Sequence, residues 1–199
     1  MIKVENLTKR YGSHNAVKGI SFQVEEGEIL GFLGPNGAGK SMTMNILTGY
    51  LSPTSGTVRI NGRDVRTIPD EELHTMFGVA FQSDSFFEGT IRENIDLGRG
   101  LPQDQIERAA RVAQAAEFIA EKDGGYDHHV HAKAVNLSGG QRQAMALLMS
   151  TMTPIEFLIL DEHTAALDPK TAEIIMELTG KIVRQKQLTT IMVTHNLRY

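Results

Sequence analysis

The segment from Gly34 to Ser41 restricts the fold of this chain more than any other part of the sequence. It reads Gly-Pro-Asn-Gly-Ala-Gly-Lys-Ser and matches the pattern G-x-x-x-x-G-K-[ST]. An apolar run at Glu28–Leu33 precedes it and predicts a buried strand, and residues 40–48 predict a helix. A glycine-rich loop in this position turns backbone N–H groups inward, and the helix start adds the positive end of its dipole. The segment therefore predicts a site for phosphate groups.

The residue types of this loop fit the binding of a nucleoside triphosphate with magnesium. Gly37 and Gly39 carry no Cβ where the backbone must approach phosphate oxygens. Lys40 supplies a cation for the β- and γ-phosphates, and the Ser41 hydroxyl can ligate Mg²⁺. A glycine-rich turn without a ligand is the alternative, and the matching strand and helix on either side make it the weaker one.

A second pattern ends an apolar strand in two acids. Phe157–Leu160 predicts a buried strand, and Asp161 and Glu162 follow it. In an open parallel sheet, ligands bind at the carboxyl ends of the strands. We expect Asp161 to hold Mg²⁺ through water and Glu162 to act as a general base. A pair of solvated acids leaving a strand is the alternative interpretation.

Predicted strands and helices alternate along the chain, which indicates an α/β fold with a mostly parallel sheet. Residues 1–82 and 151–199 are expected to form the core with an antiparallel β subdomain. Residues 83–150 are expected to form an inserted helical subdomain. Within it, Thr90–Glu93 predicts a capping box and Pro102–Glu121 predicts a helix with one apolar face.

Composition narrows the function classes. The chain has 199 residues, with 24 acidic against 20 basic residues and a formal net charge of −4, so it does not favour broad electrostatic capture of nucleic acid. The absence of cysteine excludes a disulfide scaffold, a thiolate metal site and a cysteine nucleophile. Neither a secretory signal nor an apolar stretch long enough to cross a bilayer is evident, so we expect a cytoplasmic protein.

Leu137–Gln141 reads Leu-Ser-Gly-Gly-Gln, and with the two patterns above the chain resembles a nucleotide-binding domain of the ATP-binding cassette (ABC) superfamily over essentially its whole length. The resemblance implies a P-loop NTPase core that binds ATP and Mg²⁺ and hydrolyses ATP to ADP and phosphate. It also implies a head-to-tail homodimer with ATP in the interface. Separately encoded transmembrane subunits would be its partners in transport, with the chain peripheral at the inner face of the membrane.

The resemblance also implies roles for individual residues. Nucleotide contacts are expected from Tyr11, Asn36, Gly37, Ala38, Gly39, Lys40, Ser41, Met42, Ser138, Gly139, Gly140, Gln141 and Asp168. Catalytic roles are expected for Glu162, His195 and Gln82, and Mg²⁺ contacts for Ser41, Gln82 and Asp161. Tyr11 would stack on adenine, and Ser138–Gln141 would contact the γ-phosphate held by the other protomer. Without the resemblance, Tyr11 reads as turn packing and His195 as a solvated side chain.

The sequence departs from the family pattern at several places. It ends at Tyr199, soon after His195, and we expect exposed apolar surface, lowered stability or self-association as a result. His163 follows Glu162 where many relatives carry alanine, proline or serine. The regions up to Asp64, from Phe77 to Asp127 and after Asn136 resemble different ABC subfamilies, which suggests a mosaic or a divergent natural cassette.

Ahead of the Leu-Ser-Gly-Gly-Gln segment, His131, Ala132 and Ala134 stand where fused exporters carry glycine, glutamate and glycine. His128, His129 and His131 also allow a metal interpretation, because imidazole suits Zn²⁺, Ni²⁺ and Cu²⁺. In an extended segment His129 and His131 would share one face. A solvated loop is the alternative.

Two further functions stay open at the level of sequence. One is an ATP-binding module with little or no turnover, which a truncated or chimeric cassette would be. The other is a soluble ABC ATPase that acts outside transport, although such proteins usually show tandem cassettes or long coiled-coil insertions.

Overall fold

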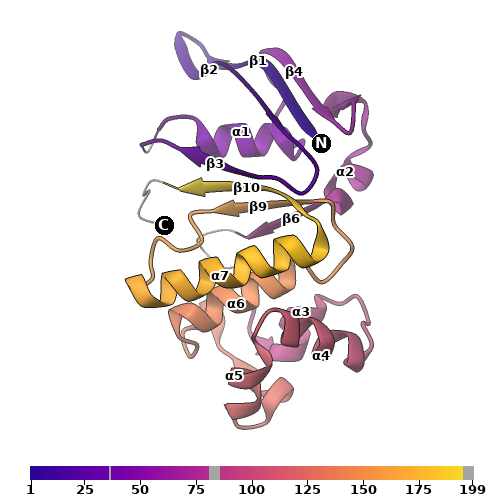
Figure 1. The fold of residues 1–199 in the computed structure, drawn as a ribbon, viewed down its shortest axis with the longest axis vertical. Helices are drawn as coiled ribbons and strands as arrows, with labels where there is room; N and C mark the ends of the chain where they lie inside the picture. The colour runs from indigo at the N-terminus through magenta and orange to yellow at the C-terminus, as the bar shows by residue number, and fades with distance from the viewer. Residues whose placement is uncertain (36, 81–85, 195–199) are drawn as a thin grey trace. The chain divides into compact units, whose positions relative to one another are not determined.

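The computed structural model describes residues 1–35, 37–80 and 86–194 (Figure 1). The described chain forms two compact units. The first contains Met1–Val79, Pro154–Asp161 and residues 187–194. The second contains Ala80–Thr153 and Glu162–Lys186. Each unit therefore combines segments that are distant in sequence.

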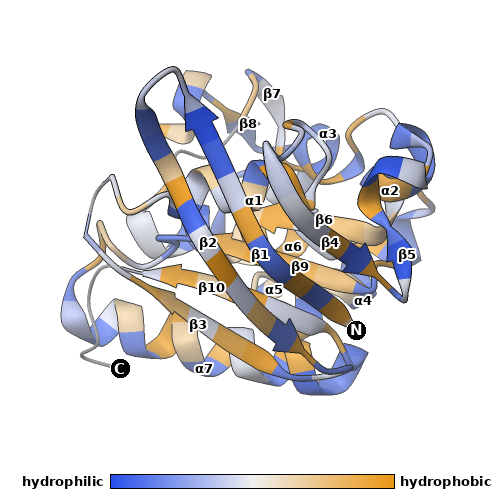
Figure 2. Ribbon diagram, turned by 90° about the horizontal axis from the view of Figure 1, so that it is seen from above, coloured by the Kyte–Doolittle hydropathy of each residue, from blue (hydrophilic) through white to orange (hydrophobic). Residues whose placement is uncertain are grey.

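The N-terminal strands of the first unit form an antiparallel sheet in the order β2-β1-β4-β5. Its strands are β1 (Ile2–Tyr11), β2 (His14–Val24), β4 (Ser55–Ile60) and β5 (Arg63–Asp64). A tight turn joins β1 to β2 and pairs Tyr11 with His14. Hydrophobic and hydrophilic residues alternate along β1 and β2, as expected for strands with one buried face (Figure 2). The antiparallel sheet expected in this part of the chain is confirmed.

The second sheet of this unit follows the order β3-β10-β9-β6. Its strands are β3 (Ile29–Leu33), β10 (Thr189–Thr194), β9 (Phe157–Asp161) and β6 (Phe77–Ala80). The central strand β10 runs parallel to both β3 and β9 (Figure 1). Val193 is paired with Asp161 and Thr194 with Leu33, so β9 and β3 end at the same edge of the sheet. This register brings the last residue of β9 to the edge at which the glycine-rich loop begins.

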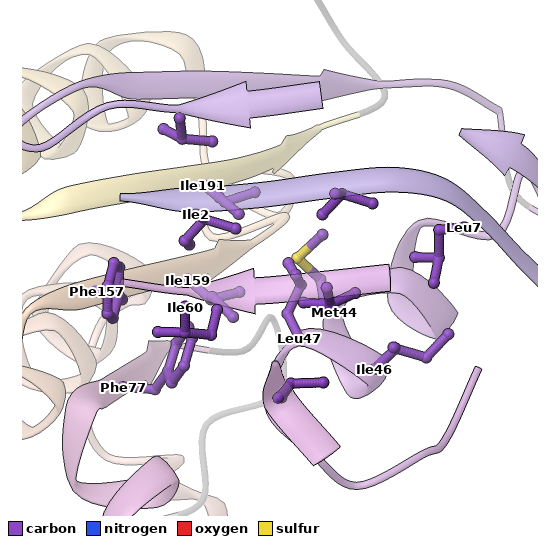
Figure 3. Packing of buried hydrophobic residues seen from close by; sticks show 14 of the residues in the cluster. Ile2, Leu7, Met44, Ile46, Leu47, Ile60, Phe77, Phe157, Ile159 and Ile191 are labelled. Carbon is purple, nitrogen blue, oxygen red and sulfur yellow. The ribbon is translucent and has the colours of Figure 1, made fainter. Parts of the chain in front are cut away.

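The core of the first unit lies between its two sheets and includes one face of helix α1 (Lys40–Leu47). Figure 3 shows Ile2 and Ile60 from the antiparallel sheet near Ile159 and Ile191 from the parallel one. All four side chains are at most 1% exposed. Burying such side chains contributes about 1.5–3 kcal/mol each. The core therefore anchors both the strand before the glycine-rich loop and the helix after it. The connection from β5 to β6 contains a 3₁₀ turn, η1 (Val65–Thr67), and helix α2 (Asp70–Met76).

The second unit is mainly helical. Its helices are α3 (Ile91–Asp96), α4 (Gln103–Val112), α5 (Ala116–Glu121), α6 (Gly139–Ser150) and α7 (Pro169–Lys186), with 3₁₀ turns η2 (Gly125–Asp127) and η3 (Ala132–Ala134). Helix α6 packs against both α7 and α3. The predicted capping box at Thr90 is confirmed, since its hydroxyl accepts from the Glu93 N–H and the Glu93 carboxylate accepts from the Thr90 N–H. Among the described residues, no helix is both long and apolar enough to cross a bilayer.

One sequence prediction for this unit needs correction, and one element of it was not predicted. The single helix expected over Pro102–Glu121 is two helices, because Gln114 adopts a left-handed φ of +49° between α4 and α5. The flanking Ala113 and Ala115 are buried, so the turn itself is part of the core. The unit also contains a small antiparallel sheet of β7 (Gly89–Thr90) and β8 (His129–Val130). Strands of two residues carry no periodic pattern and could not be read from the sequence.

Candidate functional site

The glycine-rich loop connects β3 to α1, as the sequence predicted, and two of its glycines have backbone angles that favour glycine. Gly37 and Gly39 have φ values of +83° and +84°. At Gly39 a Cβ would come within 2.3 Å of the Ala16 carbonyl oxygen on β2, a contact that no side chain tolerates. Gly39 is also the N-cap of α1 and has no side chain to accept from the first turn. The N–H groups of Ser41 and Met42 thus point out of the helix start, where an anion is stabilised.

Lys40 is 7% exposed, and its ammonium group lies within the loop. The Nζ atom donates to the carbonyl oxygen of Gly34 and, at 3.3 Å, to that of Pro35. The loop's own carbonyl groups thus hold the cation beside the start of α1. A phosphate group entering the loop would meet this cation and the helix dipole together.

A cavity of about 320 Å³ opens beside this loop, entirely within the first unit. Its lining comprises Tyr11, His14, Ala16, Pro35, Gly37, Ala38, Gly39, Lys40, Ser41 and Met42. The structure thus places seven of the predicted nucleotide contacts around one cavity. His14 was missed, and the signal that could have found it was its place three residues after Tyr11, across the turn that joins β1 to β2. Asn36, also predicted to bind nucleotide, lies outside the described residues.

Tyr11 is 49% exposed at the end of β1. Its hydroxyl group lies 3.5 Å from the Met42 Sδ atom, which ties the ring to the first turn of α1. The ammonium group of Lys9 lies 5.3 Å from the ring centroid, within the range of a cation–π contact. The lining of the cavity therefore combines donors suited to a polyphosphate with an aromatic ring.

The two acids predicted after the buried strand belong to different units. Asp161 is the last residue of β9 in the first unit, and Glu162 is the first residue of its segment in the second. Both side chains are partly buried. Glu162 has a left-handed φ of +50°, a conformation that costs a non-glycine residue about 1–2 kcal/mol. Strain at a partly buried carboxylate is a feature that often accompanies function.

His163, next to Glu162, is buried at 4% exposure. Its Nε2 atom lies 3.4 Å from the Thr179 hydroxyl oxygen on α7. That hydroxyl donates its own hydrogen to the Ile175 carbonyl oxygen, so it accepts from the imidazole N–H. Burial lowers the pKa of His163 from 6.5 to about 4, because the charged form loses its hydration. His163 is therefore neutral at physiological pH. Its side chain joins the backbone next to Glu162 to helix α7.

The Leu-Ser-Gly-Gly-Gln segment forms the start of α6. The Ser138 hydroxyl accepts from the Gln141 N–H at 3.2 Å, and the Gln141 side chain accepts from the Ser138 N–H at 3.1 Å. This capping box uses both side chains locally and leaves the N–H groups of Gly139 and Gly140 at the helix start. The arrangement is a second helix N-terminus suited to an anion, in the second unit.

Close packing gives the two glycines of α6 a further reason to lack side chains. A Cβ on Gly139 would lie 2.9 Å from Leu167, and one on Gly140 would lie 2.8 Å from Thr171. Asp168 stands between these two neighbours and caps α7, accepting from the Thr171 N–H at 3.1 Å. Hydrogen bonds from the Thr171 side chain and backbone lower the pKa of the Asp168 carboxyl. The predicted Ser138–Gln141 and Asp168 thus lie in one packed cluster.

The remaining predicted residues, Gln82 and His195, lie outside the described residues. Of the expected Mg²⁺ contacts, Ser41 and Asp161 are described and both belong to the first unit. The register of the parallel sheet puts Asp161 and the end of β3 at one edge. A hydroxyl and a carboxylate are oxygen donors of the type that Mg²⁺ prefers, so this donor set fits the ion.

Comparisons with known proteins agree with this geometry. A family model described as "ABC transporter" matches residues 17–165. The "Tyrosine transport ATP-binding protein" of Clostridioides difficile (strain R20291) is 33% identical, and the match covers 100% of this chain and 84% of the relative. A "Beta-(1-->2)glucan export ATP-binding/permease protein" of Mesorhizobium japonicum is 36% identical over 93% of this chain and 31% of the relative.

Among solved structures, a bacterial Atm1-family ABC exporter with ATP bound matches with a TM-score of 0.88 and 31% identity. The match covers 98% of this chain and 34% of the exporter chain. This chain therefore spans most of one relative and about a third of the two exporters. The fold, the order of the motifs and these matches agree that the chain belongs to the ABC transporter family as its ATP-binding domain.

Proposed function

We propose that this chain binds Mg-ATP and hydrolyses it to ADP and phosphate within a head-to-tail dimer of two copies. The observation that carries the proposal is the cavity beside the glycine-rich loop. There the start of α1, the buried ammonium of Lys40 and the ring of Tyr11 line one space of about 320 Å³. Backbone N–H groups and a cation suit a polyphosphate, and an exposed aromatic ring suits a base.

The dimer follows from the chemistry of the γ-phosphate. One loop leaves the outer oxygens of a triphosphate open to water. A second helix start closes that side, and α6 offers one in which Ser138 and Gln141 are already engaged with each other. Supplied by the other copy, the N–H groups of Gly139 and Gly140 would bind the γ-phosphate and exclude water.

Residue roles within this proposal follow the donor chemistry. Ser41 and Asp161, together with Gln82, would hold Mg²⁺, which supplies charge neutralisation at the β- and γ-phosphates. Glu162 would accept a proton from the attacking water, and Gln82 and His195 would orient the γ-phosphate. Lys40 would exchange the loop carbonyls for phosphate oxygens.

The first experiment measures phosphate release from the wild-type chain and from Glu162→Gln. We expect the variant to lose at least about 10²-fold in rate while still binding ATP, since a general base contributes about 10²–10⁴-fold. Equal rates would remove Glu162 from catalysis. Binding of ATP with no turnover in either protein would favour the binding module over the ATPase.

The second experiment measures molar mass by size-exclusion chromatography with light scattering. Glu162→Gln with Mg-ATP is expected to elute as a dimer, and without nucleotide as a monomer. Lys40→Ala serves as the matched control and should not dimerise with Mg-ATP. A mass that does not change with nucleotide would contradict the ATP-bound dimer.

Transport is the expected use of the hydrolysis. The relatives include one named as a separate ATP-binding protein and others named as fused ATP-binding/permease proteins. We propose that this chain acts on transmembrane subunits at the inner face of a membrane. The test is to express the tagged chain in its native cells, to solubilise the membranes with detergent and to purify the chain by its tag. Transmembrane subunits should then co-purify with it.

A further inference from the structure

Three side chains that can coordinate a metal ion lie close together outside the proposed nucleotide site, beside the small β7–β8 sheet of the second unit. Glu88 directly precedes β7, His129 lies in β8 and His131 follows it. Figure 2 shows the two strands together. One ligand atom from each side chain lies within 4.8 Å of the others, and all three side chains are exposed. The sequence singled out His129 and His131 but indicated no carboxylate from elsewhere in the chain. The structure adds Glu88, from a distant part of the sequence.

The backbone around Glu88 is held by a buried asparagine. Asn94 on α3 is 0% exposed. Its side chain accepts from the Phe87 N–H at 3.1 Å and donates to the carbonyl oxygens of Phe87 at 3.1 Å and Thr90 at 3.0 Å. The chain is thus fixed immediately before Glu88 and shortly after it. Glu88 therefore projects from a rigid support although its own side chain is in solvent.

A second asparagine does the same for the histidines. The Asn136 side chain accepts from the His131 N–H at 3.0 Å and donates to the His129 carbonyl oxygen at 2.8 Å. These two hydrogen bonds keep the segment extended. The imidazoles of His129 and His131, which are two residues apart, therefore project to the same side. Their ring centroids are 5.5 Å apart.

His128 has a different role. Its Nδ1 atom lies 3.0 Å from the Asp123 carbonyl oxygen and its Nε2 atom 3.3 Å from the Asn136 amide. Both ring nitrogens are therefore engaged in the structure of the loop. In the described part of the chain, by contrast, the imidazoles of His129 and His131 and the Glu88 carboxylate make no side-chain hydrogen bond.

We propose that Glu88, His129 and His131 bind one divalent first-row transition-metal ion such as Zn²⁺, with water completing the coordination. Two neutral imidazoles and a carboxylate are ligands that Zn²⁺, Ni²⁺ and Cu²⁺ favour over Mg²⁺. Tetrahedral Zn²⁺ with bonds of about 2.0–2.2 Å holds its ligand atoms about 3.3 Å apart. Rotation of three exposed side chains closes the difference from 4.8 Å without movement of the backbone.

The charge around the cluster also favours a cation. Besides Glu88, the carboxylate of Glu93 adds negative charge here, since it accepts from the Thr90 N–H and Thr90 is paired with His129. Glu93 itself is occupied by its capping box and is not counted as a ligand. An ion bound here would join the segment before β7 to the segment around β8. Its effect would be to stabilise the second unit, since a clip across a long loop lowers the entropy of the unfolded chain.

The experiment is calorimetric titration of the full chain with Zn²⁺ alone, without nucleotide. We expect one site per chain in the wild type. We expect affinity to fall about tenfold or more in His129→Ala and in His131→Ala, and measurably in Glu88→Gln. His74→Ala, which replaces an exposed histidine of the first unit, is the matched control and should keep the site.

Two further readouts test the same ligands. Co²⁺ in place of Zn²⁺ should give the visible absorption of a tetrahedral site, and the double variant of His129 and His131 should not. Zn²⁺ should raise the thermal midpoint of the wild type and leave that of the double variant unchanged, while circular dichroism confirms that both are folded. Absence of heat with the wild type, or equal Zn²⁺ affinity in the wild type and the folded double variant, would overturn the proposal.

Discussion

The buried His163 makes a quantitative prediction about stability and pH. Its pKa is 6.5 in an unfolded chain and about 4 in the folded one, because burial disfavours the imidazolium. The unfolded chain therefore takes up a proton at a higher pH than the folded chain does. The stabilisation is fully present above about pH 6.5 and is lost progressively as the pH falls toward about 4.

The magnitude follows from the two pKa values. At about pH 5 the unfolded histidine is almost fully protonated and the folded one is mostly neutral. The free energy of unfolding is then lower by about 2 kcal/mol than at about pH 7.5, and by about 3 kcal/mol once the pH is below both values. This is a large part of the stability of an ordinary domain.

Urea unfolding of the wild type and of His163→Gln at several pH values between about 5 and 7.5 measures the contribution of His163 to the free energy of unfolding. Glutamine does not titrate, and its amide can still donate to the Thr179 hydroxyl. We expect the variant to lose about 2 kcal/mol less than the wild type over this range. His74→Gln should follow the wild type. Parallel curves for the wild type and His163→Gln would refute the assignment of a depressed pKa to His163.

Substitutions at three positions of the site, two of them with matched control variants, test it further. Gly39→Ala should abolish ATP binding and lower the melting temperature, because its Cβ would lie 2.3 Å from the Ala16 carbonyl oxygen; unchanged nucleotide affinity would argue against the loop geometry. Ser138→Ala and Thr90→Ala each remove a capping box and should each cost about 1 kcal/mol by chemical denaturation, but only Ser138→Ala should weaken ATP-driven dimerisation in light scattering. Tyr11→Ala should weaken ATP binding by about 5- to 150-fold in fluorescence titration, whereas Tyr11→Phe should bind as the wild type does; equal loss in both would remove the ring stacking.

Sequence alone was sufficient where a local pattern determines the local structure. The apolar run before Gly34 and the glycine spacing predicted β3, the loop and α1, and the structure has them at those residues. The expected burial of β3 was wrong, because β3 is at the edge of its sheet and its Ile29 and Leu33 side chains are exposed. The capping box at Thr90 was predictable for the same reason, because all of its hydrogen bonds lie within four residues.

Contacts between distant segments were not predictable in this way. Nothing near His129 in the sequence indicates Glu88, because the β7–β8 pairing that unites them is only two residues long. The break at Gln114 depends on the burial of the alanines beside it, which an apolar stripe does not reveal. The burial of His163 likewise depends on α7, which supplies Thr179.

The packing of Leu167 over Gly139 and of Thr171 over Gly140 has an evolutionary consequence. Selection acts on these two glycines twice, once for the anion they would bind and once for the neighbours that leave them no room. A descendant that had abandoned nucleotide turnover would still have to shift the Leu167 or Thr171 side chain if it replaced either glycine. The packing constraint on Gly139 and Gly140 does not depend on ATP turnover. An inactive paralogue of this cassette should therefore keep both glycines after it has lost Glu162.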